Sequence, residues 1–74
     1  MAPYGYQVQA GKLIPNKREL HICRTVVNLV DRDGLTHSET ARELARRGYK
    51  TRTGNPKWDS KTIFNIYKRW QGKI

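Results

Sequence analysis

Several polar positions near the carboxyl end of the sequence carry side chains of the kinds that bind DNA. Lys61, Asn65, Lys68 and Arg69 are spaced so that they lie on one face of a helix. An asparagine amide can pair with adenine through two hydrogen bonds, an arginine guanidinium can do so with guanine, and lysines contact phosphates. A basic face that is only solvated is the alternative. We predict that this face contacts double-stranded DNA.

Six further cations precede this face, and we predict that they lie near phosphates on either side of it. They belong to the preceding helix and loop: Arg42, Arg46, Arg47, Lys50, Arg52 and Lys57. The chain carries a net charge of +9, and ten of its fifteen Lys and Arg lie in residues 38–74. Such a balance, gathered in one half of a chain, is typical of proteins that bind nucleic acid.

The sequence offers little for catalysis. No nucleophile with a nearby base, no carboxylate pair and no set of metal ligands stands at a useful spacing, and no glycine-rich phosphate loop occurs. His21 and His37 belong to different predicted elements and are typical surface residues. Cys23 lies in an apolar stripe, where a small buried hydrophobe is expected. We therefore expect no enzyme, no cofactor and no metal.

The size of the chain limits it to one small domain. With 74 residues it has little core to spare for a deep substrate pocket. Its single cysteine cannot form an intramolecular disulfide, and no stretch is apolar for long enough to be a signal peptide or a membrane span. We expect a cytoplasmic, nucleoid-associated protein whose residues 1–74 form a single DNA-binding domain.

Capping residues and apolar spacing predict three helices. Asn16 can cap the first, with Glu19 returning a bond to it; Thr36 and Glu39 form the same arrangement before the second, and Asp59 can cap the third. The predicted helices cover residues 17–32, 37–47 and 60–71. Alternating residues in the segment 1–15 predict a short β-hairpin or extended arm. The glycine, asparagine and proline in the segment 49–58 predict a loop or wing.

Apolar residues at helical spacing predict one shared core. The first helix contributes Leu20, Ile22, Cys23, Val26, Val27, Leu29 and Val30. The inward residues expected on the second helix are Ala41, Leu44 and Ala45, and those on the third are Ile63, Phe64, Ile66, Tyr67 and Trp70. We expect Trp58 to pack under the loop, whereas Tyr4 and Tyr6 could pack on the helices or contact a ligand.

These elements predict a mainly α fold. It is a three-helix, helix-turn-helix-like domain with a small N-terminal β-hairpin or arm and an extended loop or wing between helices 2 and 3. In such a motif the last helix enters the major groove and the preceding helix crosses the backbone. The connection here is about a dozen residues, longer than the three to four of the usual motif, so we expect a variant geometry.

The order of several motifs resembles a known family. "PYGYQVQAGKLIPN", then Glu19 in a helix, then "GLTHSETARELARRGYKTRTGNPKW" and a closing helix resemble the recombinase domain of serine recombinases, the DNA-binding region that follows the catalytic domain in the large members. The resemblance spans Pro3 to about Tyr67. It implies DNA binding at recombination sites through the loop and last helices. The resemblance implies no strand cleavage by this chain, because the serine nucleophile of that family lies in a separate catalytic domain that this chain lacks.

The residues and the resemblance together predict site-specific binding of double-stranded DNA, of the kind used in recombination. The alternative is a small basic interaction protein that binds an acidic protein partner and modulates the transcription or recombination machinery. RNA is a weaker candidate, because the aromatic residues are assigned to the core and not to base stacking. Binding to a membrane surface is weaker still, because the helices need their apolar faces for one another.

Overall fold

The computed structural model describes residues 2–74, and Met1, at the edge of the predicted 1–15 arm, lies outside the described residues. The described elements are β1 (Tyr6–Gln9), β2 (Lys12–Pro15), α1 (Lys17–Asp31), α2 (His37–Arg46) and α3 (Ser60–Trp70). The mainly α fold with a small antiparallel hairpin is confirmed. Each helix ends one residue before its predicted end. The segment between α2 and α3 is a loop without strands.

The starts of the helices follow the predicted caps, with one exception. Thr36 and Glu39 exchange both bonds of a capping box at the start of α2, and the Asp59 carboxylate accepts from the backbone N–H of Thr62 at the start of α3. Asn16 caps α1 by accepting from the N–H of Glu19. The predicted return bond from Glu19 to Asn16 is wrong, because the Glu19 carboxylate accepts instead from the N–H of Gly5.

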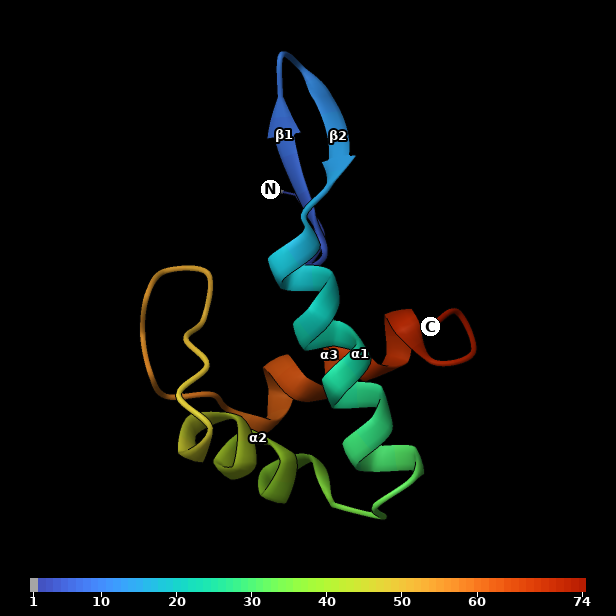
Figure 1. Cartoon of the computed structure of the whole chain (residues 1–74), viewed down its shortest axis with the longest axis vertical. Helices are drawn as coiled ribbons and strands as arrows, with labels where there is room; N and C mark the ends of the chain where they lie inside the picture. The colour runs from blue at the N-terminus through green and yellow to red at the C-terminus, as the bar shows by residue number, and fades with distance from the viewer. Residues whose placement is uncertain (1) are drawn as a thin grey trace.

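The core lies where α3 packs against both other helices. Figure 1 shows α3 crossing α1, with α2 at the end of the molecule away from the hairpin. Buried apolar residues come from all three helices and the loop: Ile22, Cys23, Val26, Val27, Leu29, Ala41, Leu44, Trp58, Ile63, Ile66 and Trp70. Trp58 packs under the loop as predicted, and its indole N–H donates to the carbonyl of Tyr49. Of the helices in residues 2–74, none has the length and apolar content that crossing a bilayer requires.

Two predicted core residues are wrong. Phe64 is 45% exposed, and Ala45 is exposed as well. The buried stripe of α3 is narrower than the sequence suggests: Ile63, Ile66 and Trp70 belong to the buried core, whereas Phe64 lies outside it. On α2 the inward position is taken by Thr40, which is fully buried and donates its hydroxyl to the carbonyl of Thr36.

The hairpin stands on the first turn of α1 and projects away from the helices (Figure 1). Its two-residue turn, Ala10 and Gly11, has positive φ at both positions, as a tight hairpin turn requires. Only its base is packed. The ring of Tyr6 stacks on Trp70 at 5.7 Å between centroids, and the Trp70 indole N–H donates to the carbonyl of Tyr4 at 3.0 Å. Tyr4 and Tyr6 therefore pack on the helices.

Gly5 is the position where the backbone of the hairpin base comes closest to the core. Its φ is +105°, and a methyl group added there would lie 2.7 Å from the Trp70 ring. We expect Gly5→Ala to lower the free energy of unfolding by about 1–2 kcal/mol for the backbone conformation, plus about 1–3 kcal/mol for the clash. Gly54→Ala is the control, since Gly54 also has positive φ (+84°) but has nothing within 4 Å. Urea unfolding of both variants measures the difference; equal losses would contradict a close approach to Trp70.

Candidate nucleic-acid interface

The outer face of α3 presents the four side chains predicted to contact DNA. Lys61, Asn65, Lys68 and Arg69 are all exposed, and they lie on the side opposite the buried stripe. No Asp or Glu occurs in residues 60–74, so nothing within this segment neutralises the cations. Asn65 and Arg69 also line a shallow hollow together with Pro3 and Tyr4. These four side chains thus lie on the side of α3 that the core does not use.

The cations of α2 are only partly available. Arg42 is exposed and makes no ion pair with the acidic residues of the described chain. Arg46 and Arg47 both bind the carboxylate of Glu43, with Nε to oxygen distances of 2.9 and 2.7 Å. Hydrogen bonds from Arg46 and then Arg47 lower the pKa of Glu43 to about 2. A phosphate at this helix would therefore compete with Glu43 for the two arginines.

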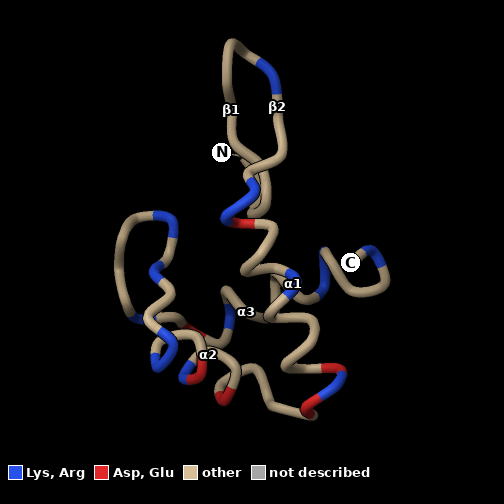
Figure 2. The backbone as a smooth tube through the Cα atoms, in the orientation of Figure 1, with Lys and Arg blue, Asp and Glu red and all other residues tan. Residues whose placement is uncertain are grey.

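The loop between α2 and α3 adds two cations that face outward. Lys50 and Lys57 are exposed and make no ion pair within residues 2–74. The loop is held by its own backbone, since the Thr51 N–H donates to the Asn55 carbonyl at 2.8 Å. Figure 2 shows the basic residues of the second half along α2, this loop, α3 and the C-terminal segment. One further basic residue, Lys12, lies at the start of β2 next to the hairpin turn.

The third predicted cation of the loop, Arg52, has a structural role. The prediction that it contacts phosphate is therefore corrected. Its guanidinium points inward, where it binds both carboxylate oxygens of Glu19 at 2.9 and 2.7 Å. It also donates to the carbonyls of Ala2, Pro3 and Tyr6. All three nitrogens are engaged, so the planar fork that could clamp a phosphate is already filled.

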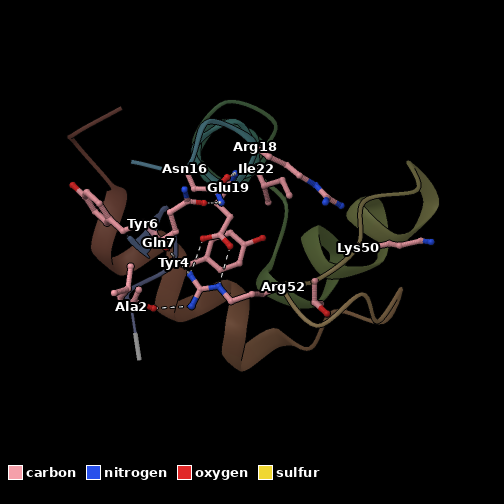
Figure 3. Close-up of a pocket in the computed structure, with 12 residues that line it drawn as sticks. Ala2, Tyr4, Tyr6, Gln7, Asn16, Arg18, Glu19, Ile22, Lys50 and Arg52 are labelled. Atoms are coloured by element: carbon pink, nitrogen blue, oxygen red, sulfur yellow. Dashed lines mark hydrogen bonds and ion pairs between the residues drawn. The ribbon is translucent and has the colours of Figure 1, made fainter. Parts of the chain in front are cut away.

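Figure 3 shows this pairing, which we call the Glu19–Arg52 clamp, between the hairpin base, α1 and the loop, with Lys50 pointing away from it. The ring of Tyr4 lies beside the clamp, 5.3 Å from the guanidinium carbon. Burial of Glu19 raises the pKa of its carboxyl, but hydrogen bonds from Arg52 and from the Gly5 N–H outweigh that effect. The net result is a lowered pKa, so the carboxylate stays charged at neutral pH.

Two contacts between a histidine and an aromatic side chain were not expected from the sequence. His37, at the first turn of α2, lies with its ring 5.4 Å from the ring of Phe64 on α3. The Nε2 atom of His21 on α1 lies 3.0 Å from the hydroxyl oxygen of Tyr49 at the start of the loop, within hydrogen-bond distance. No periodicity could indicate either pair, because each joins two different elements. Within residues 2–74, no three His, Cys, Asp or Glu side chains gather as a metal site would need.

We expect loss of the Arg52 side chain to affect folding more than charge. Arg52→Ala should lower the free energy of unfolding by about 1–3 kcal/mol, because it removes the hydrogen bonds from Arg52 to the Glu19 carboxylate and to three carbonyls. Lys50→Ala removes an equal charge from the same loop but no ion pair of residues 2–74, and should change stability by less than about 0.5 kcal/mol. Thermal or urea unfolding distinguishes the two. Equal effects would mean that the clamp contributes nothing.

The lowered pKa of Glu19 predicts a pH-dependent part of the stability. Because the folded state holds the carboxylate below its usual pKa of 4.5, the unfolded chain binds the proton first. The contribution of Glu19 is therefore complete above about pH 5 and is lost as the pH falls through the folded pKa. Urea unfolding of Glu19→Gln between about pH 7 and pH 3.5 should show a shallower loss of stability than the unsubstituted chain. Parallel pH profiles would contradict a lowered pKa.

Comparison with known proteins gives one match. A family model described as Recombinase matches residues 17–70, which include all three helices and the loop between α2 and α3. No curated protein and no solved structure matched the chain. The matched residues contain the outer face of α3 and the loop, and exclude the hairpin. The chain therefore belongs to the recombinase family, which places its role in DNA recombination.

Proposed function

We propose that the chain binds double-stranded DNA in a sequence-dependent way, with the outer face of α3 in the major groove. The observation that carries this proposal is the two-sided character of α3. Its apolar side completes the core through Ile63, Ile66 and Trp70. Its other side presents three cations and an asparagine that lie outside the core, and the cations make no ion pair within residues 2–74. A surface that is basic, exposed and unnecessary for packing is available for a polyanion.

The dimensions of α3 suit this role. Its 11 residues give a length of about 16 Å at the usual rise, and an α-helix fits the major groove of B-form DNA. Asn65 lies in the middle of the exposed face, where it can reach a base edge. Lys61 and Lys68 lie one turn on either side of it, at the positions from which side chains reach phosphates.

The cations of α2 and the loop would flank this helix. Arg52 and the two arginines that share Glu43 are set aside. Six of the ten predicted DNA-binding residues are then cations without an ion pair in residues 2–74: Arg42, Lys50, Lys57, Lys61, Lys68 and Arg69. Contacts to phosphates position a protein on the duplex without reading sequence, and contacts from α3 would read it. Binding of this kind would associate the chain with the nucleoid.

DNA is the partner that the family match favours, and no comparable observation favours an acidic protein. We propose that these residues bind DNA and do not cut it, so that the chain acts as a binding module and not as an enzyme. The polar residues on the outer face of α3 are lysine, arginine and asparagine, which are suited to hold phosphates and bases. Within recombination this module would supply attachment to the DNA site.

The proposal predicts a strong dependence of DNA affinity on salt. Four to six phosphate contacts release their counterions, so the logarithm of the association constant should fall with the logarithm of salt concentration at a slope of about −4 to −5. Fluorescence anisotropy with a labelled duplex, from low to moderate salt, measures it. A flat response, or no binding at low salt, rejects the proposal.

A matched pair of variants localises the contact within the same measurement. Lys68→Ala on the outer face of α3 should weaken binding and reduce the slope by about 1. Arg32→Ala removes the same charge from the end of α1, where Asp31 and Asp33 flank it, and should leave the slope unchanged. Equal effects of the two substitutions would mean that net charge alone attracts the duplex.

A further inference from the structure

Phe64 is a partly exposed aromatic side chain at the edge of the outer face of α3, outside the buried core. It is 45% exposed, and it lies one turn from both Lys61 and Lys68 and next to Asn65 in sequence. The other large exposed apolar side chains of residues 2–74, Val8 and Leu13, belong to the projecting hairpin. Phe64 is thus a large apolar group within an otherwise polar and basic surface.

The ring of Phe64 is held in place on one side. The imidazole of His37 meets it edge to face at 5.4 Å between centroids, and His37 also lies 6.0 Å from the ring of Tyr67. Tyr67 in turn donates its hydroxyl to Asp31 on α1. The ammonium of Lys68 lies 5.8 Å from the centre of the Phe64 ring. These contacts fix where the ring stands, so it does not need to be ordered when a ligand binds.

The chemistry around Phe64 indicates what its exposed part could contact. The neighbouring cations favour an anionic partner, and an anionic duplex offers few apolar groups to a side chain in its grooves. In the major groove the apolar group on a base edge is the C5-methyl of thymine, which phenylalanine and other apolar side chains contact. Resting on the proposed function, we propose that Phe64 packs against a thymine methyl beside the base that Asn65 contacts. Phe64 is then a specificity-determining residue.

The test compares thymine with uracil, which differs by that methyl group alone. Duplexes that the unsubstituted chain selects from a random pool supply the probe, and each is remade with uracil at one thymine position at a time. At one position the unsubstituted chain should bind the uracil duplex about fourfold more weakly, because burying one such group contributes that much. Phe64→Ala should bind the thymine duplex about fourfold more weakly and no longer distinguish it from the uracil duplex.

Two controls separate this contact from other effects. Asn65→Ala should weaken binding yet keep the thymine preference, since it leaves the Phe64 ring in place. Phe64→Ala loses the ring contact with His37 and should lower the unfolding midpoint by about 4–8 °C. Circular dichroism checks that the variant is folded at the temperature of the binding measurement. Salt-dependent binding with no uracil effect at any position, or selected duplexes without thymine, overturns the role of Phe64 and leaves the proposed function standing. Absence of duplex binding at low salt overturns both, and leaves a protein partner for this aromatic.

Discussion

An ion pair between Arg52 and Glu19 joins three separate parts of the chain: the loop between α2 and α3, the start of α1 and the hairpin base. The guanidinium of Arg52 binds Glu19 on α1 and three carbonyls of residues 2–6. Burying charges costs free energy unless the remaining hydrogen-bonding groups are satisfied. Here the Gly5 N–H supplies a further bond to the carboxylate, so the clamp is well satisfied. The clamp holds the loop against α1 and the hairpin base.

The contrast between the buried apolar side and the exposed polar side of α3 follows from the packing of such a small domain. A chain of this size needs every large buried side chain, and Ile63, Ile66 and Trp70 all point into the single core. The remaining side of the helix is then free to vary without loss of stability.

The sequence predicted what local physics decides. Capping residues marked the starts of α2 and α3 because the groups that satisfy each other are three residues apart. It failed where the partner is remote. Arg52 and Glu19 are separated by 33 residues, so a basic residue in a basic loop gave no sign that its side chain turns inward. Phe64 fitted the apolar spacing as well as Ile63 did, and only the placement of α1 and α2 decides which is covered.

Both tryptophans of the chain are buried, and their indole N–H groups donate to carbonyls of different segments. Trp58 bonds to Tyr49 at the start of the loop, and Trp70 bonds to Tyr4 beside the hairpin base. The fluorescence of each indole therefore depends on whether one peripheral segment, the loop or the hairpin base, is packed on the helices. The protein in this way contains two natural fluorophores, and replacing one with phenylalanine would leave the emission of the other to report separately on loop or arm.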